Sequence, residues 1–274
     1  MTDASLPQLL SVAEAAADAA ASLLREEFMR MQSSAGHDLA VRWKGTPHDP
    51  VTACDLAAQK CITDMITRSF PTHRILAEEE GADKYGDSQS PYLWVVDPLD
   101  GTNNFIRGKD SFGTIVAVMK GDELLTGCMV LPMRGERFTA AKGQGAFANG
   151  QPVRLRKTVG MKDAILCSNI TRRACPDASG VLRVNMPDCT SMENYGCAAR
   201  AIGDVLLGWN DGVFFRGLRL WDIAAGFLML TEAGGRCRYE WEESGNPRGG
   251  VSCVGATPAI FDDLCSFVFE HKLA

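Results

Sequence analysis

Hydrophobic residues near the start of the chain recur every three or four positions, which is the spacing of one helix face. Ser5-Leu6-Pro7-Gln8 resembles a capped helix start. Glu14, Asp18 and the charged residues 25–27 interrupt or border the apolar run, which is therefore too short to span a bilayer. We expect an amphipathic helix packed on the body of the protein, with its apolar side formed by Leu9, Val12, Ala13, Ala16, Ala20, Leu23, Leu24 and Phe28.

A second helix is expected from about Thr52 to Phe70, because Pro71 stops it. We place Leu56, Ile62, Met65, Ile66 and Phe70 on one side of this helix. Short apolar and β-branched runs after it predict strands at residues 74–77, 92–96, 114–119 and 124–130.

The pattern changes near residue 150. Residues 143–150 predict a hairpin, since Asn149-Gly150 favours a type I′ turn. Beyond it the sequence predicts strands at 164–167 and 213–215 and helices at 198–207 and 222–233, the last closed by Gly234-Gly235. We therefore predict an α+β subdomain over residues 1–148 and an α/β subdomain over residues 149–274.

Charge and cysteine usage narrow the class of protein. The net charge of −6 over 274 residues argues against a protein that wraps nucleic acid, which would need a basic face. The ten cysteines are scattered without a C-x-x-C pair, so we expect buried, reduced thiols. No signal peptide or membrane span is predicted, and a cytoplasmic location is expected.

Three acidic segments stand at the predicted ends of elements: Glu78-Glu79, Asp97 with Asp100, and Asp222. Taken singly, they are also typical of a solvated loop, a turn and a helix cap. Brought into one pocket, such carboxylates would repel one another unless a cation joined them. Oxygen ligands without His or Cys favour Mg²⁺, Mn²⁺ or Ca²⁺ over zinc, and the spacing is not that of an EF-hand.

The segments ILAEEEG (75–81), WVVDPLDGTNNFIRG (94–108) and WDIAAGFLMLTEAGG (221–235) together resemble the signatures of the inositol monophosphatase family. Further similarity runs from about Lys44 to Gly255. The resemblance implies a Mg²⁺-dependent, lithium-sensitive phosphomonoesterase and a homodimer. It also implies the layered αβαβα sandwich of the inositol monophosphatase and fructose-1,6-bisphosphatase type.

The resemblance also implies a set of metal ligands and catalytic groups. One metal would be surrounded by Glu78, Asp97, Thr102 and the carbonyl of Leu99, and a second by Asp97, Asp100 and Asp222. Two or three Mg²⁺ ions, or Mn²⁺ in their place, would clamp the phosphate and activate a water. Further roles are implied for residues around the metals: Asp55 would act with Thr102 on that water, Glu79 would hold a water beside the metals, and Lys44 would lie on a mobile loop entering the site.

The resemblance implies the substrate contacts less completely than the metal ligands, because several substrate positions differ from the family pattern. The amides of Gly101 and Thr102 would meet the phosphate, and Gly196-Cys197-Ala198 replaces the usual Gly-Ser/Thr-Ala. Phe215 occupies the position of a glutamate that contacts sugar hydroxyls, and a phenylalanine accepts no hydrogen bond. Four positions are open: Asp211 is a substrate carboxylate or a turn residue, Arg216 and Arg219 bind a second anionic group or are surface charges, and Glu193 replaces a common arginine.

The sequence therefore predicts hydrolysis of a small phosphate monoester, such as inositol 1-phosphate, by a metal-activated water. Histidinol phosphate, fructose 1,6-bisphosphate and 3′-phosphoadenosine nucleotides stay open as substrates. The ammonium of histidinol phosphate could pair with Glu193 or Asp211. A regulatory role through a protein partner is the alternative from another class, and no nucleic-acid or membrane partner is expected.

Overall fold

The computed structural model describes most of the chain. It covers residues 4–33, 41–43, 50–79, 81, 85–170, 174–176, 182–184, 186–243, 246 and 248–270. Side chains are described for all of these except 43, 174–176 and 182–184. Lys44, expected on a loop at the site, lies outside the described residues.

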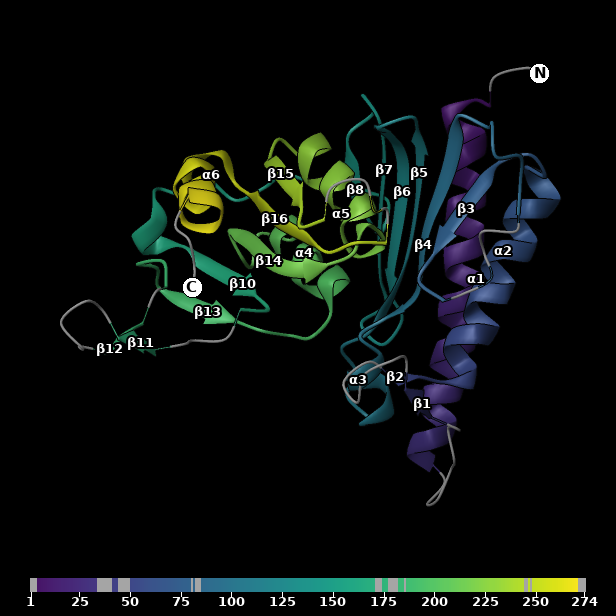
Figure 1. The fold of residues 1–274 in the computed structure, drawn as a ribbon, viewed down its shortest axis with the longest axis horizontal. Helices are drawn as coiled ribbons and strands as arrows, with labels where there is room; N and C mark the ends of the chain where they lie inside the picture. Colours follow the sequence, from purple (N-terminus) through teal and green to yellow (C-terminus); the bar gives the residue numbers. More distant parts are fainter. Residues whose placement is uncertain are drawn as a thin grey trace.

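Two helices cover one face of a seven-stranded sheet (Figure 1). They are α1 (Leu6–Ser33) and α2 (Ala53–Ser69). The strand order is β3-β4-β5-β6-β7-β8-β9. The strands are β3 (Arg74–Ala77), β4 (Tyr92–Asp100), β5 (Gly113–Lys120), β6 (Glu123–Leu131), β7 (Glu136–Ala141), β8 (Ala146–Ala148) and β9 (Gln151–Pro152).

A second, five-stranded sheet lies beyond a middle layer of helices. The middle layer consists of α4 (Ala198–Leu206) and α5 (Leu220–Glu232), which share one apolar core with both sheets. The second sheet has the order β13-β10-β14-β16-β15. Its strands are β10 (Ile165–Ser168), β13 (Ser191–Glu193), β14 (Gly212–Leu218), β15 (Arg236–Trp241) and β16 (Val251–Ala256). Helix α6 (Pro258–Cys265) packs on this sheet, so the layers run α, β, α, β, α as expected.

Smaller elements complete the described chain. They are β1 (Arg42–Trp43) with β2 (Pro50–Val51), α3 (Thr102–Ile106), a 3₁₀ turn at Met161–Asp163, β11 (Ala174–Pro176) with β12 (Leu182–Val184), and a π-helical turn at Ser266–Glu270. Among the described residues, no helix combines the length and apolarity needed to cross a bilayer.

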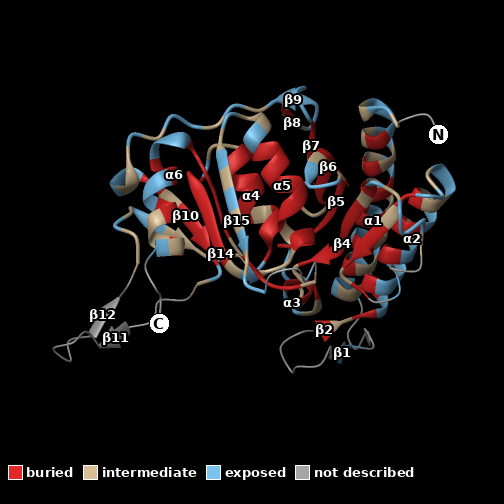
Figure 2. Cartoon of the chain, turned by 45° about the horizontal axis from the view of Figure 1, so that its top comes forward, coloured by how far each residue is buried: buried red, intermediate tan, exposed pale blue. Residues whose placement is uncertain are grey.

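Local signals correctly predicted several elements. The buried residues of α1 follow the predicted spacing, and Figure 2 shows its buried side turned to the sheet. Thr52 caps α2: its hydroxyl accepts from the amide of Asp55, and the Asp55 carboxylate accepts from the amide of Thr52. Asn149 and Gly150 both have positive φ, 48° and 77°, as a type I′ turn requires.

The structure also corrects some sequence-based expectations. Leu56 is 47% exposed, so it does not share the buried side of α2. Helix α5 begins at Leu220, which places Asp222 in its first turn and not at its start. In the first sheet β3 and β4 run parallel, and the other neighbouring strands run antiparallel. The first sheet also includes β9, which lies past the predicted subdomain boundary at 148/149; the division into two subdomains stays a prediction.

Candidate functional site

A polar cavity of about 180 Å³ lies where β3, β4, α3 and α5 come together. All six residues predicted as metal ligands line it. They are Glu78, Asp97, Leu99, Asp100, Thr102 and Asp222, and Pro50, Gly101, Asn103 and Gly196 complete the wall. Segments far apart in the chain thus contribute to one site, from Glu78 at the end of β3 to Asp222 in α5.

Strand β4 carries two of the carboxylates through an irregular stretch. The expected turn after Val96 is a bulge within the strand instead: Asp97 pairs with Ile115, and after a register shift Asp100 pairs with Gly113. Pro98 has no N–H to offer the neighbouring strand, and its carbonyl accepts from the Thr114 hydroxyl at 3.0 Å. The bulge brings Asp97 and Asp100 to the same cavity.

Gly101 ends this stretch in a conformation that other residues avoid. Its φ is +91°, and it precedes the first residue of α3. A Cβ atom here would lie 2.9 Å from the carbonyl oxygen of Ser111 and 3.3 Å from Cys197 Cβ. Glycine is therefore required both for the backbone angle and for the close approach of the Ser111 and Cys197 segments.

The Asp97 carboxylate is buried among the other carboxylates of the cavity. Burial raises its pKa well above the usual value, and the charges of Glu78, Asp100 and Asp222 raise it further. Asp97 shares hydrogen bonds with the Glu78 and Asp222 carboxyl groups. Burial and then Asp100 raise the pKa of Asp222 to about 8. Such a set binds protons unless another cation replaces them.

Asp100 is anchored by the start of α4. One carboxylate oxygen, Oδ2, accepts from the amide of Ala199 at 2.6 Å and lies 3.1 Å from the Cys197 thiol. Burial raises the pKa of Asp100, and these hydrogen bonds lower it. The Cys197 thiol, whose pKa burial raises well above its ordinary value, is thus the neutral donor of this pair. Helix α4 partly compensates the buried negative charge.

Asp55 and Thr102 are in direct contact. The Thr102 hydroxyl lies 3.0 Å from Asp55 Oδ1 and 3.1 Å from the Leu99 carbonyl oxygen. The other oxygen of Asp55 accepts from the amide and hydroxyl of Thr52, at 2.8 and 2.5 Å. Burial raises the pKa of Asp55, and the Thr52 hydrogen bonds oppose this. The N-cap residue Thr52 therefore orients the Asp55 carboxylate, and Asp55 in turn orients the Thr102 hydroxyl.

The remaining two acidic residues, Asp222 and Glu78, each contact an arginine. Asp222 Oδ2 accepts from the amide of Arg219 at 2.6 Å. The carbonyl of Glu78 accepts from the Arg248 guanidinium at 3.3 Å, and this guanidinium lies 5.7 Å from the centre of the Trp221 ring. Arg248 is therefore the cation that the described structure places beside this end of the cluster, and no sequence motif marked it.

The donor set fits a hard divalent cation. Four carboxylates, one carbonyl and one hydroxyl line the cavity, and oxygen ligands of this kind suit Mg²⁺, Mn²⁺ or Ca²⁺. In the part of the chain that the structure describes, no three His, Cys, Asp or Glu side chains form a ready-made metal-ligand arrangement.

Glu79, expected to hold a water beside the metals, is 3% exposed and does not line the cavity. Its backbone amide and carbonyl are both bonded to the Gln59 side chain, at 2.9 and 3.0 Å. The structure thus places Glu79 next to Glu78, behind the cavity wall.

A second cavity of about 210 Å³ adjoins the first and shares Asp100, Gly196 and Asp222 with it. Three predicted substrate residues line it as well: Cys197, Ala198 and Phe215. Sequence reasoning missed the other lining residues, because no motif marks them; they are Cys167, Asn169, Asn194, Tyr195 and Leu218. The wall thus combines apolar, thiol and amide groups with the two carboxylates that it shares with the first cavity.

Several predicted substrate residues are not brought to these cavities. Arg216 points to the C-terminal segment, where its guanidinium donates to the carbonyl of Val268 at 2.6 Å. Asp211 is fully buried, and its two oxygens accept from the Thr158 hydroxyl and the Ile165 amide, at 2.6 and 2.8 Å. These contacts favour the open alternative of a structural aspartate.

Glu193 also has protein partners. Its carboxylate accepts from the Tyr195 hydroxyl and, at 3.1 Å, from the Asn210 side chain. Glu193 is not among the residues that line either cavity.

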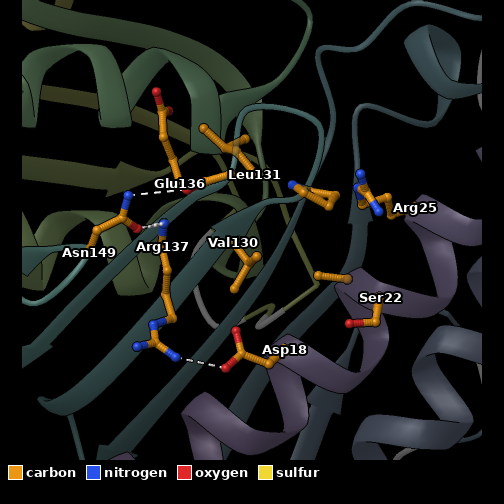
Figure 3. Close-up of a pocket in the computed structure, with 11 residues that line it drawn as sticks. Asp18, Ser22, Arg25, Val130, Leu131, Glu136, Arg137 and Asn149 are labelled. Atoms are coloured by element: carbon orange, nitrogen blue, oxygen red, sulfur yellow. Dashed lines mark hydrogen bonds and ion pairs between the residues drawn. The ribbon is translucent and has the colours of Figure 1, made fainter.

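A larger cavity of about 380 Å³ lies away from the carboxylates, between α1 and the β6–β7 connection (Figure 3). Its charged groups are largely satisfied. Arg137 pairs with Asp18 at 2.8 Å, and Asn149 accepts from the amide of Arg137. This cavity has no carboxylate cluster and does not serve as the candidate active site.

Comparisons with known proteins agree with the geometry. The sequence profile of the inositol monophosphatase family matches residues 5–255. Nus factor SuhB of Pasteurella multocida is 34% identical over 260 residues, covering 93% of this chain and 94% of that protein. A fructose-1,6-bisphosphatase/inositol-1-monophosphatase of Aquifex aeolicus is 32% identical, covering 94% of both.

Solved structures show the same fold. The inositol monophosphatase of Anabaena superposes with a TM-score of 0.75 at 28% identity, covering 97% of this chain and 96% of that one. The suhB protein of Bartonella henselae superposes with a TM-score of 0.74 at 26% identity, covering 92% and 94%. The chain belongs to the inositol monophosphatase family. It is a phosphoric monoester hydrolase of the layered αβαβα type.

Proposed function

We propose that this protein hydrolyses a small-molecule phosphate monoester with the help of two or three Mg²⁺ ions, or Mn²⁺ in their place. The observation that carries the proposal is the convergence of Glu78, Asp97, Asp100 and Asp222 on one buried cavity. The raised pKa values of Asp97, Asp100 and Asp222 are what a cluster awaiting a cation should have.

Bound Mg²⁺ would neutralise the carboxylates, attract the anionic phosphate and make water more acidic. The chain's own residues position the reactants. Thr102, oriented by Asp55, lies where it can align a water for attack on phosphorus, and Asp55 is the nearest group to take up the proton. Gly101, Thr102 and Asn103 line the wall where the phosphate would lie. As the water oxygen bonds to phosphorus, the bond between phosphorus and the ester oxygen breaks, and the leaving alkoxide takes a proton from solvent to become the alcohol.

The second cavity supports a leaving group that is not a bare polyol. Phe215, only 4% exposed, and the half-buried Leu218 form an apolar part of the wall. The amides of Asn169 and Asn194 and the Tyr195 side chain are polar groups of the wall, in addition to the Asp100 and Asp222 carboxylates that the first cavity shares. Inositol has hydroxyls around its whole ring, and burying them against a phenylalanine would leave hydrogen bonds unmade. We therefore favour a substrate with one apolar or planar side, among which histidinol phosphate and a phosphorylated adenosine nucleotide qualify.

Phosphate release should be measured with inositol 1-phosphate, histidinol phosphate, fructose 1,6-bisphosphate and 3′-phosphoadenosine 5′-phosphate, with Mg²⁺ and with EDTA. We expect release that requires Mg²⁺, is greatest for a substrate with an apolar or planar side, and falls by at least about 10³-fold in Asp97→Asn. Asp64→Asn, which changes an exposed carboxylate on α2, is the matched control and should keep full activity. Near wild-type turnover in Asp97→Asn would contradict the site assignment.

The leaving-group proposal has its own test. Phe215→Glu places an acceptor in the second cavity and should raise kcat/KM for inositol 1-phosphate relative to the best natural substrate. An unchanged ratio, with the fold intact by circular dichroism, would show that Phe215 does not choose the substrate.

A partner-binding role is a second candidate, favoured by the relatives named Nus factor SuhB. A role of this kind would survive Asp97→Asn, whereas hydrolysis would not, so this variant separates the two in a binding assay with transcription factors. Homodimer formation, lithium sensitivity and a cytoplasmic location also stay predictions. Sedimentation analysis and lithium titration of Mg²⁺-dependent turnover would test the first two.

A further inference from the structure

The Asn104 side chain joins three segments of the chain beside the carboxylate cavity. Its amide nitrogen, Nδ2, donates to the carbonyl oxygens of Ser111, Tyr195 and Gly196, at 2.8, 2.7 and 3.2 Å. Ser111 leads into β5, and Tyr195 and Gly196 lead into α4. Asn104 itself belongs to α3 and is only 8% exposed. It is not among the residues that line the carboxylate cavity or the second cavity.

These contacts, which we call the Asn104 clamp, depend on the hydrogen-bond donors of the side chain. An asparagine amide carries two N–H groups, one for each of the two shorter bonds, and the longer contact with Gly196 shares one of them. Without donors, the three converging carbonyl oxygens would repel one another and stay unpaired in the interior. Leucine has a branched shape similar to that of asparagine but no donor, so Asn104→Leu removes the bonds while keeping the space filled.

Two of the same carbonyls lie against Gly101, the residue that precedes α3. A Cβ atom at position 101 would lie 2.9 Å from the Ser111 oxygen and 3.3 Å from the Gly196 oxygen. Asn104 draws both oxygens toward α3. The close approach at Gly101 is therefore stabilised by the Asn104 clamp.

The segment that the clamp holds also positions Asp100. Cys197 follows Gly196 directly and is the N-cap residue of α4. In the first turn of this helix the amide of Ala199 donates to Asp100 Oδ2 at 2.6 Å, and the Cys197 thiol lies 3.1 Å from the same oxygen. Gly196 lines both the carboxylate cavity and the second cavity. A shift of this segment would therefore move the anchor of an expected metal ligand together with a wall that both cavities share.

We propose that Asn104 is a positioning residue of the candidate active site. It holds the start of α4 against Gly101, and through the Ala199 amide it sets the position of the Asp100 carboxylate. The consequence for Mg²⁺ affinity rests on the proposed function, whereas the clamp itself does not.

The first experiment tests the clamp in the full chain without metal. Cys197 is 6% exposed, so its alkylation by N-ethylmaleimide in EDTA, followed by mass spectrometry, reports opening at the start of α4. Cys128 and Cys253 are fully buried elsewhere, and their alkylation reports global unfolding. We expect the rate at Cys197, relative to the rates at these two cysteines, to rise about tenfold in Asn104→Leu.

Gln32→Met is the matched control. The Gln32 amide donates to the carbonyl of Gly108 at 3.0 Å, so this variant also removes an amide–carbonyl bond from the loop after α3 but leaves the start of α4 untouched. Its relative rate at Cys197 should equal that of wild type. An unchanged relative rate in Asn104→Leu, or an equal rise in the control, would overturn the proposal. Asn104→Ala tests the same point if the leucine variant folds poorly.

The second experiment measures Mg²⁺ binding by calorimetry and Mg²⁺-dependent turnover. Asn104→Leu should bind Mg²⁺ at least about fivefold more weakly than wild type, and excess Mg²⁺ should restore most of kcat. A purely structural role would instead lower the amount of active protein at every Mg²⁺ concentration.

A double variant tests whether Asn104 acts through Asp100. In an Asp100→Asn background, Asn104→Leu should weaken Mg²⁺ binding no further, because the carboxylate that it positions is already gone. An additive loss of affinity in the double variant would overturn the proposal. Failure of the proposed function gives a different result: wild type would bind no Mg²⁺, and the alkylation of Cys197 would still decide whether the clamp holds the start of α4.

Discussion

The carboxylate cluster should make the metal-free protein less stable as the pH rises. Asp97, Asp100 and Asp222 have raised pKa values because they are buried together. In the unfolded chain an aspartate titrates near pH 3.9. A raised folded pKa means that the folded protein keeps protons that the unfolded chain releases. The resulting stabilisation is complete below about pH 4 and is lost as the pH rises through the folded pKa, about 8 for Asp222.

The size of the effect follows from the pKa difference. Each pH unit changes the free energy of unfolding by about 1.4 kcal/mol per proton. For Asp222 this amounts to at most about 5 kcal/mol between pH 4 and 8, an upper limit because Asp222 keeps partial contact with solvent. Between pH 6 and 8 we expect a loss of about 2 kcal/mol, which lowers Tm by roughly 4–8 °C.

The assay is thermal unfolding at pH 6, 7, 8 and 9, in EDTA and in Mg²⁺. In EDTA, Tm should fall across this range, and Mg²⁺ should raise Tm most at the alkaline end, where the carboxylates are ionised. Asp222→Asn should flatten the pH dependence in EDTA and weaken the effect of Mg²⁺. Asp64→Asn should change neither, since that carboxylate is exposed.

A flat or rising Tm between pH 6 and 9 in EDTA would refute the reasoning. So would an Asp222→Asn protein that keeps the wild-type slope, because the protons would then be bound elsewhere.

Three further predictions concern the body of the fold. Burial lowers the pKa of His73, so its contribution to the free energy of unfolding should be complete above about pH 6.5 and should be lost on acidification. Chemical unfolding of His73→Gln should therefore show a smaller loss of stability between about pH 6.5 and 5 than wild type shows. Gly127→Ala would place Cβ 2.9 Å from Ala225 Cα and should cost about 1–3 kcal/mol in urea unfolding, whereas Gly160→Ala meets nothing within 4 Å and should cost little. Thr52→Ala should lower the free energy of unfolding by about 1 kcal/mol and reduce kcat, while Thr52→Ser should restore both.

Elements with a strong local signal could be predicted from the sequence. The apolar spacing of α1, the cap at Thr52 and the Asn149-Gly150 turn each depend on residues a few positions apart. The three acidic segments were also recognisable, because each adjoins an apolar run in the sequence. Their convergence in one cavity was available only from the family resemblance.

Features that depend on distant neighbours were predicted less well. The bulge in β4 follows from its pairing with β5, and the exposure of Leu56 follows from which side of α2 the sheet covers. The direction of Arg216 is set by the carbonyl of Val268, 52 residues away. The sequence shows that Phe215 stands where the family resemblance implies a glutamate. It does not show which residues the Phe215 side chain contacts.

The two middle helices, α4 and α5, connect the packing of the fold with the carboxylates of the site. Buried carboxylates are unfavourable, and here they are offset by backbone amides from the middle helices: Ala199 of α4 donates to Asp100, and Arg219, directly before α5, donates to Asp222. Both helices are held between the two sheets by one apolar core. A change in that core should therefore move the carboxylates as well as lower stability. Gly127→Ala tests this, because β6 contacts α5 at that glycine, and Mg²⁺ affinity should weaken together with the free energy of unfolding.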